Sequence, residues 1–318
     1  MNFQLRHNLL ITIFIIVIIA TMWLMMKGLS YSFDLLNTKA TEVPAESRTH
    51  FQEVAYIEKI DEFALQEFGV DQVLSHLVEA DSYFNFKDTP ALLINPRVTT
   101  YNLHGEKDYI LSSKRAHYLD SGEVSFKGKV DVSSSDGIKH KMNTQELLID
   151  THTDDLISHK EVTYLGESAK IISEGMHMRT KTNKMKLTGD ARIHQNSGQE
   201  MLTRNIYIDQ SNKKKHYYSD DKTTYLSNEN KIYADGMDMD MNKKITHLLG
   251  QVNIVQNSGS IIKTNNLILD QSNDREVYKT NDDIHYQSSI ADIRAKSMHY
   301  DAARQKIKLD GGVIGRYD

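Results

Sequence analysis

The stretch IRAKSMHYDAARQKIKLDGGV, from Ile293 to Val313, holds two runs of alternating apolar and polar residues joined by a polar turn. The same skeleton occurs earlier in the chain, as IYADGMDMDMNKKITHLLGQV from Ile232 to Val252, and once more from Ile171 to Ala191. A constant step of 61 separates the glycines Gly128, Gly189, Gly250 and Gly311 and the tyrosines Tyr164, Tyr225 and Tyr286. A fixed period of this length predicts a stacked array of repeated structural units.

A second segment with the same pattern lies between these copies, so that the period divides in two. One example is Met201-x-Thr203-x-x-Ile206-x-Ile208-Asp209, in which alternating apolar and small residues flank a two-residue gap and an acid follows. The alternation predicts β-strands, and the gap predicts a bulge or bend that changes the exposed face. The acid predicts the start of a turn. It recurs as Asp150, Asp209, Asp240, Asp270 and Asp301, with Arg179 in its place in one unit.

The composition narrows the class of protein. The chain has 318 residues, a net charge of −5 and no cysteine. Without cysteine there is neither a disulfide framework nor thiol chemistry. The mild negative charge offers no basic face for nucleic acid, and the run Lys213–Lys215 stands where a solvated turn is expected. The hydropathy and the few prolines indicate a polar-surfaced β protein with a thin core.

The amino terminus carries an uninterrupted apolar run from Leu9 to Met26, which is long enough to span a bilayer. Arg6 and His7 precede it, so residues 1–8 are expected to stay in the cytoplasm and the rest to be exported. The residues after the run form a poor cleavage site, which favours an uncleaved anchor over a signal peptide. Residues 27–54 are polar and read as a linker.

The stretch from His50 to Phe68 is open to two interpretations. Its propensities fit a helix, but it could equally supply the strand that opens the array, with Phe63, Leu65 and Phe68 facing inward. From Val73 onward the pattern is typical of strands.

The residues that follow resemble a known family. DEFALQEFGVDQVLSHLVEADSYFNF, the run Pro96-x-Val98-x-x-Tyr101-x-x-x-Gly105 and the strand that begins at Leu111 are similar to LptC, the membrane-anchored periplasmic component of lipopolysaccharide export. The later hairpins are similar to LptA, the soluble bridge of the same machine. The chain departs from LptC in length, because two further units of the repeat follow residue 195. It resembles an LptC with an LptA-like extension, in domains 55–195 and 196–318.

The resemblance implies an all-β fold, an antiparallel twisted β-jelly roll that is open along one edge. One transmembrane helix is expected to precede this roll in the sequence. The repeat agrees, since units of about 30 residues with two strands each give on the order of 17 strands. The implied location is the inner membrane, with one span, a cytoplasmic amino terminus and a periplasmic bulk. The implied role is passive: acyl chains of lipopolysaccharide would move in an apolar groove, from an ABC transporter toward the outer membrane.

The implied partners are lipopolysaccharide, that transporter, and a soluble LptA-type protein or another copy of the chain joined end to end. No cofactor is expected, and no metal. The side chains expected to line the groove are Phe63, Leu65, Leu111, Tyr118, Met142, Ile149, Met176, Met178, Ile208, Met237, Met239, Leu269 and Met298. The last strand, with Val313, Ile314 and Tyr317, is expected to be an edge that pairs with a partner strand.

Two repeated sets of polar residues invite a catalytic or metal-binding interpretation. His117, His177 and His299 share one position of the repeat, but it is the outward position between two apolar residues, which speaks against a metal site. The acidic pairs Asp154–Asp155, Asp220–Asp221 and Asp282–Asp283 are expected in solvated turns. We therefore expect no enzyme. Two other functions stay open: an anchored structural or adhesive β-array without a lipid ligand, and a β-solenoid enzyme acting on polysaccharide.

Overall fold

The chain divides into two units, residues 1–54 and 55–318. The computed structural model describes residues 56–69, 72–102, 104–119, 121–135, 140–211, 215–273 and 275–317, all within the second unit. The predicted tail, membrane span and linker of residues 1–54 lie outside these ranges. In the described part of the chain, no helix is long and apolar enough to span a membrane.

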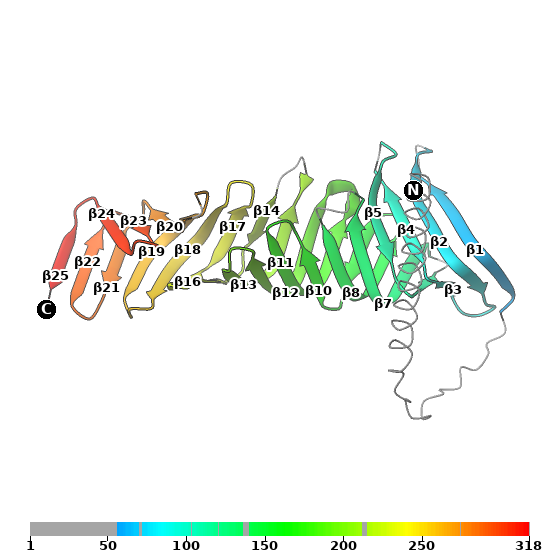
Figure 1. The fold of residues 1–318 in the computed structure, drawn as a ribbon, viewed down its shortest axis with the longest axis horizontal. Coiled ribbons are helices and arrows are strands. Elements are labelled where there is room, and N and C mark those ends of the chain that lie inside the picture. The colour runs from blue at the N-terminus through cyan, green and yellow to red at the C-terminus, as the bar shows by residue number, and fades with distance from the viewer. Residues whose placement is uncertain are drawn as a thin grey trace, which may run out of the picture. The chain divides into compact units, whose positions relative to one another are not determined.

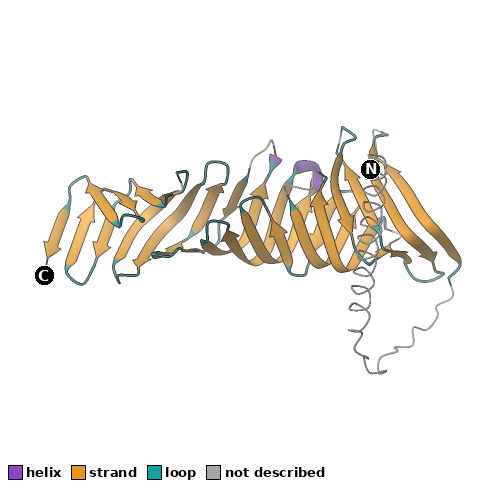
Figure 2. Cartoon of the chain, viewed as in Figure 1, coloured by secondary structure: helices purple, strands orange, loops and turns teal. Residues whose placement is uncertain are grey.

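The described unit consists almost entirely of antiparallel strands (Figure 2). The first strands are β1 (Glu58–Phe68), β2 (Leu74–Asn85), β3 (Ala91–Ile94), β4 (Arg97–Tyr101), β5 (Lys107–Ser112), β6 (Arg115–Tyr118), β7 (Glu123–Ser134) and β8 (Lys141–Asp150). The middle strands are β9 (Asp155–Ser158), β10 (Val162–Leu165), β11 (Ala169–Arg179), β12 (Lys184–Gln195), β13 (Glu200–Asp209), β14 (His216–Ser219), β15 (Thr223–Leu226), β16 (Asn230–Ala234) and β17 (Gly236–Asp240), with one short 3₁₀ turn, Thr180–Thr182. The last strands are β18 (Ile245–Gln256), β19 (Ile261–Asp270), β20 (Val277–Thr280), β21 (Ile284–Gln287), β22 (Ala291–Ala295), β23 (Ser297–Asp301), β24 (Lys306–Asp310) and β25 (Ile314–Tyr317).

We call each stretch of chain between two successive hairpin turns an arm. Each arm bends in its middle, so that its two halves belong to two facing half-sheets. In β8, for example, Lys141–Thr144 pair with β10, whereas Leu148–Asp150 pair with β9. Several arms are interrupted at the bend and count as two short strands, such as β9 with β10 and β14 with β15. When such halves are taken together, the 25 described strands agree with the predicted number of arms. The arms follow one another in chain order from β1 to β25 (Figure 1).

The recurring glycines produce the bends. The pairing register shifts at Lys127/Val130, Leu187/Asp190 and Leu248/Gln251, next to Gly128, Gly189 and Gly250. Gly250 has a φ of +72°, a left-handed conformation that glycine adopts without a steric penalty. A β-carbon there would lie 2.6 Å from Oδ2 of Asp235. The predicted two-residue gap lies opposite such a glycine bulge: Arg204 and Asn205 of β13 face the extra residue of β12 beside Gly189.

The core is a column of apolar side chains between the two half-sheets. It includes the fully buried Phe126, Leu187 and Leu248, contributed by the long arms at a step of 61. At the two ends of the array the column is only partly covered: Phe63 and Tyr83 lie half-buried at one end, and Ile307 and Leu309 at the other. The interior thus runs through the whole described unit.

The fold confirms the all-β prediction. The ambiguous stretch forms strand β1, which pairs with β2 in an antiparallel ladder, and Phe63 and Leu65 pack against the core. The inward prediction for Phe68 is wrong, because the register shifts at the end of β1 and leaves this ring 60% exposed. The hydrogen-bonded ladder is continuous across residue 195, where β12 pairs with β13. The division into domains at that residue stays a prediction.

Candidate functional site

The hairpin turns of the array lie along two opposite edges of the folded sheet, because successive arms run antiparallel. The turns 166–168, 196–199 and 227–229 belong to one edge. The turn 241–244 and the described turn residues 210–211, 215, 271–273 and 275–276 belong to the other. Side chains of one edge contact side chains of the other. We call the line along which the two edges meet the seam.

Tyrosine and glutamine side chains join the two edges at a regular interval. Nε2 of Gln210 donates to the hydroxyl of Tyr164 at 2.6 Å, and Nε2 of Gln271 donates to the hydroxyl of Tyr225 at 3.3 Å. Both rings are buried, and burial raises the pKa of both hydroxyls well above the usual value, so that they remain neutral. We call these two pairs the clasps. They hold the seam closed over the apolar column.

One ion pair and a further hydrogen bond support the clasps. Lys215 forms an ion pair with Glu167 beside the first clasp. Nε2 of Gln305 donates to Glu229 at 3.3 Å near the second. These groups are partly exposed, so the ion pair by itself contributes little to the free energy of unfolding.

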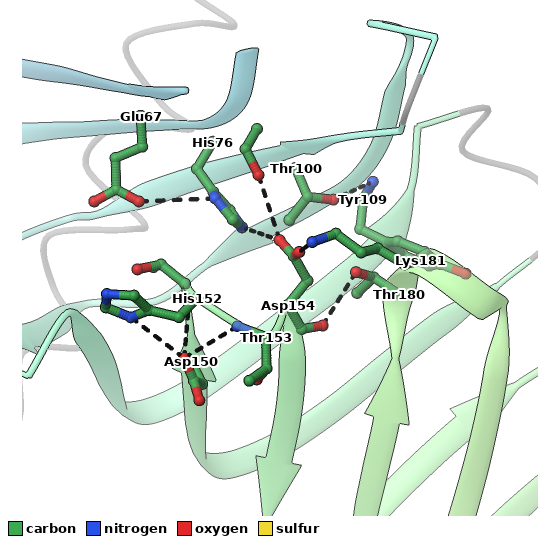
Figure 3. A network of polar contacts seen from close by, with 12 residues as sticks. Glu67, His76, Thr100, Tyr109, Asp150, His152, Thr153, Asp154, Thr180 and Lys181 are labelled. Atoms are coloured by element: carbon green, nitrogen blue, oxygen red, sulfur yellow. Dashed lines mark hydrogen bonds and ion pairs between the residues drawn. The ribbon is translucent and has the colours of Figure 1, made fainter. Parts of the chain in front are cut away.

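A buried polar network joins the edges near the start of the array (Figure 3). Nε2 of His76 in β2 lies 3.0 Å from Oδ1 of Asp154, which also pairs with Lys181. The other ring nitrogen of His76 faces Glu67 at 3.7 Å, and Thr180 donates to the backbone oxygen of Asp154 at 3.1 Å. Burial alone would raise the pKa of Asp154, but His76 and Lys181 outweigh it and hold that pKa below its usual value.

A cavity of about 420 Å³ opens in the seam between the two clasps. We call it the port. It lies between the turn 196–199 of one edge and, on the other edge, the turn 241–244 with Gln271, Arg275 and Glu276. Met239 and Met241 supply its apolar part. Lys244, Arg275 and Glu276 supply its charged part. The port reaches the column at Met239, which is nonetheless only 1% exposed.

The polar side of the port holds two unsatisfied acceptors. Within the described residues, the Oε1 atoms of Gln195 and Gln199 are buried and have no hydrogen-bond partner. Nε2 of Gln195 reaches only the sulfur of Met239, at 4.0 Å. A buried amide oxygen without a donor is unfavourable.

The structure places all the predicted groove residues on the inner face. Phe63, Leu65 and Tyr118 are partly buried against the core at its first end, and the hydroxyl of Tyr118 donates to Glu67 at 2.7 Å. The others are at most 4% exposed: Leu111, Met142, Ile149, Met176, Met178, Ile208, Met237, Met239, Leu269 and Met298. The predicted edge residues Val313, Ile314 and Tyr317 are 51, 70 and 74% exposed. That these residues touch lipid or a partner stays a prediction.

Comparison with known proteins identifies the family. The model of the LptC-related lipopolysaccharide-assembly family matches residues 14–196 and 178–257. These matches span more than half of the sequence. The chain belongs to the LptC-related family.

The end of this LptC-related chain matches a second family. Residues 231–315 match the LptA/LptD N-terminal domain family of lipopolysaccharide transport proteins. The predicted LptC relationship with an LptA-like extension is confirmed, and the chain has a part in lipopolysaccharide transport. The two families consist of bridge proteins rather than enzymes.

The other two comparisons add nothing to this assignment. A search of curated proteins finds no match. Among solved structures, the WD40 domain of SCAP from fission yeast aligns with 80% of the chain and 83% of its own length at 10% identity. The TM-score of 0.14 is too low to support a shared fold.

The polar repeats of this LptC-related chain differ in part from the sequence-based expectation. The expectation of a solvated turn is wrong for Asp154, which is 5% exposed because β2 and the turn at Thr180 pack over it. The histidine position is outward, as predicted, and Nε2 of His177 lies 2.9 Å from Asp155. In the described residues, no cluster of acidic and histidine side chains could hold a metal ion.

Sequence reasoning missed the polar half of the seam. Gln210 and Gln271 keep the repeat step of the tyrosines they contact, and that step was the available signal. Gln195 keeps the same step as Gln256, but Gln199 does not, since Ser260 stands one repeat after it. Only the contacts across the seam distinguish them.

Proposed function

We propose that the chain is an inner-membrane-anchored periplasmic component of the lipopolysaccharide export bridge. It receives lipid from an ABC transporter and passes it toward the outer membrane, with the acyl chains in the apolar interior. The proposal is supported by the family matches from residue 14 to residue 315, together with an apolar column that continues through the described part of the same chain. The apolar run at residues 9–26 would supply the anchor.

The interior has the properties that a passive conduit needs. Transfer of an acyl chain out of water is favourable by about 0.8 kcal/mol per methylene group, so the column needs no specific contact to attract it. Met142, Met176, Met201 and Met237 are all buried in the column. Their unbranched side chains adapt to irregular shapes. The burial of apolar surface can hold a lipid there without specific contacts, so the lipid remains free to slide.

The side chains of the column are buried against one another, so acyl chains must displace them or part the seam. The clasps are hydrogen bonds between neutral groups, each with a net contribution of about 1 kcal/mol. Such contacts open at a small cost compared with the gain from burying several methylene groups. The seam is therefore the route by which the interior takes up acyl chains, while the sugar and phosphate groups stay in solvent.

The ends of the array would connect the chain to its partners. Among the described residues, β25 pairs with β22 alone, and its Ile314 and Tyr317 are exposed. An unpaired strand edge with apolar side chains is a template for another strand. We propose that this edge takes a strand of a soluble LptA-type protein or of a second copy of the chain.

Site-specific photocrosslinking in cells tests the conduit. A photoreactive residue at the inward Ile208 should give a lipopolysaccharide adduct, and one at its outward neighbour Tyr207 should not. An Ile208→Asp variant, read with the probe at Met142, should lose most of its adduct while membrane insertion persists. Adducts at neither inward position in a folded, anchored chain would reject the conduit.

One observation favours a second function. The packed column is what a structural or adhesive β-array without a lipid ligand would show, since such an array needs a filled core. The same experiment distinguishes the two functions. A structural array predicts no adduct at Ile208 and an Ile208→Asp defect in folding alone.

Truncation at Lys306 tests the proposed edge. Removing β24 and β25 should weaken capture of the LptA-type partner more than lipid crosslinking at Ile208. Equal loss of both would mean that these strands only stabilise the roll.

A further inference from the structure

The outer surface of one half-sheet carries an unbroken row of facing side chains. In the half-sheet that contains β15, β16, β21 and β22, each outward residue lies opposite the next, beginning with Ile172 opposite Arg192 and Arg192 opposite Leu202. All members of the row are at least partly exposed, and none of them is acidic. We call this series the outer row: Ile172, Arg192, Leu202, Thr224, Tyr233, Asn253, Lys263, His285, Arg294 and Ile314.

Two hollows lie along the outer row, one repeat apart. The first has a volume of about 600 Å³ and lies at β12 and β13, and the second has a volume of about 590 Å³ and lies at β18 and β19. Residues 190–192 and 202–204 line the first, and their equivalents at a step of 61, residues 251–253 and 263–265, line the second. Four strand spacings separate β12 from β18, so the hollows are about 19 Å apart at ~4.8 Å per strand.

Each hollow has more positive than negative charge. The acid at the rim of each hollow already has a partner: Asp190 lies 2.8 Å from Nε of Arg204, and Asp283 lies 3.5 Å from Nζ of Lys296. Each hollow also has two basic side chains that form no ion pair with any described residue: Arg192 and Lys222 in the first, and Lys263 and Arg294 in the second. The hollows can therefore bind two separate anionic groups.

The part of the outer row between the two hollows is polar and aromatic. Thr224, Tyr233 and Asn253 follow one another across neighbouring strands there. The ring of Tyr233 is 40% exposed, and Nζ of Lys231 lies 5.1 Å from its centroid. A ring edged by hydroxyl and amide groups can contact both the apolar face and the hydroxyl groups of a sugar.

We propose that the outer row binds the acidic glycan of the cell wall, a polymer of acetylated sugars whose peptide branches carry carboxylates. Carboxylates pair with the cations of the two hollows, and the sugars between them lie along Thr224, Tyr233 and Asn253. The choice of this glycan rests on the proposed function, because a bridge between the two membranes has to cross the cell wall. The row lies on the outside of the array, so the glycan and a lipid in the apolar column do not compete.

Other occupants fit the outer row less well. A bilayer would need protruding apolar side chains, whereas Ile172 and Leu202 line a hollow. A strand of another protein would need an unpaired strand edge, whereas the strands from β12 to β22 are hydrogen-bonded on both sides. A second copy would need free acids on its opposite half-sheet, but Asp240 and Asp270 there already pair with lysines at 2.8 and 2.7 Å.

Sedimentation with purified peptidoglycan sacculi tests the proposal. The full chain in detergent micelles should sediment with the sacculi, and its binding should weaken as salt rises, because exposed charges are screened. The double variant Arg192→Gln with Lys263→Gln should lower the affinity about tenfold, the combined effect of losing two exposed charge contacts. The matched control is Lys184→Gln with Lys306→Gln, which makes the same change of charge at exposed positions of the other half-sheet and should leave binding unchanged. Absence of binding, or an equal loss in both double variants, overturns the proposal.

Further probes identify the ligand. Tyr233→Ala should lower the affinity several-fold, and sacculi whose carboxylates have been amidated should bind at least tenfold more weakly. Equal binding to natural and amidated sacculi overturns the carboxylate contacts. Tighter binding to phosphatidylglycerol vesicles, or displacement by lipid-free lipopolysaccharide saccharide at lower concentration than by soluble peptidoglycan fragments, overturns the cell-wall glycan as the ligand.

The photocrosslinking probe at Ile208 separates this proposal from the conduit, because sedimentation requires no lipopolysaccharide. A lipopolysaccharide adduct at Ile208 in a chain that does not sediment with sacculi rejects the glycan site and leaves the conduit standing. Sedimentation that depends on Arg192 and Lys263, without an adduct at Ile208, rejects the conduit and leaves the glycan site on a structural array.

Discussion

A hydrogen bond crosses the seam at Tyr225 and a cavity lies in it beside Met239, although both residues belong to the same repeated pattern of strands. At the clasp, a buried ring reaches the opposite edge and its hydroxyl receives Gln271. At the port, a thioether takes the inward position and two amide oxygens are left without donors. The side chains at each place therefore decide where hydrogen bonds cross the seam and where a cavity remains.

The two positions also differ in what holds them together. The clasp depends on a buried ring of large volume, and the port on small, flexible methionines beside a cavity. Tyr225 and Met239 stand at different positions of the repeat, since Tyr225 recurs as Tyr164 and Tyr286 and Met239 as Met178 and Tyr300. Variants that change one position and not the other measure this difference.

Loss of the ring at the clasp should have the largest effect. Tyr225→Ala removes a fully buried side chain and should lower the free energy of unfolding by about 3–5 kcal/mol. Tyr225→Phe should cost only about 1 kcal/mol, since it deletes just the bond to Gln271. Urea denaturation of the full chain, followed by circular dichroism, measures both. The control is Tyr233→Ala, whose ring is 40% exposed and outward. A similar loss in this control would contradict the clasp.

Asp154→Asn should have the second-largest effect on stability, because it leaves His76 and Lys181 without their carboxylate. We expect a loss of about 2–3 kcal/mol at pH 7. The pKa of Asp154 is lowered in the folded chain, so its contribution is full above the unfolded pKa of about 3.9 and is lost as the pH falls below that value. The difference between variant and natural chain should therefore shrink on acidification. The exposed pair of Asp190 with Arg204 gives the control, and Asp190→Asn should cost less than about 0.5 kcal/mol.

The bends should tolerate alanine unequally. Gly250→Ala forces a β-carbon to within 2.6 Å of Asp235 in a left-handed conformation and should cost about 2 kcal/mol. Gly128 has nearly the same φ, but nothing lies within 4 Å of the added carbon. Gly128→Ala should cost about 1 kcal/mol. Equal costs in thermal denaturation would show that the backbone conformation alone, and not the contact with Asp235, limits the bend.

Replacing a glutamine by leucine should have the smallest effect on the free energy of unfolding, and the sign of this effect should differ between the two repeats. Gln195→Leu removes an amide oxygen that has no donor and should stabilise the lipid-free chain by about 1 kcal/mol. Gln256→Leu breaks the hydrogen bond to Tyr300 and should destabilise it by a similar amount. Hydrogen exchange of the neighbouring amides resolves such differences. Destabilisation by Gln195→Leu would mean that this side chain is satisfied without a ligand.

The sequence by itself determined the arms of the array and their inward faces. The period of two fixes which side chains share a face, and the recurring glycine marks the place where the face changes, so Met237, Met239 and Met298 could be assigned inward without coordinates. These features are local: each depends on residues within one arm and its turn. The repeat then copies them along the chain.

Only the tertiary structure decided the seam. Tyr225 and Gln271 come from separate arms, and Asp154 and His76 lie even farther apart along the chain, over separations at which a periodic pattern carries no pairing information. Asp154 looks like any acid in a turn until β2 covers it. Likewise, the apolar pattern of the column fits an open groove and a packed core equally well, because burial between two half-sheets requires apolar side chains in both. The position of the port follows from which turns face each other once every arm has folded, and that depends on the whole array.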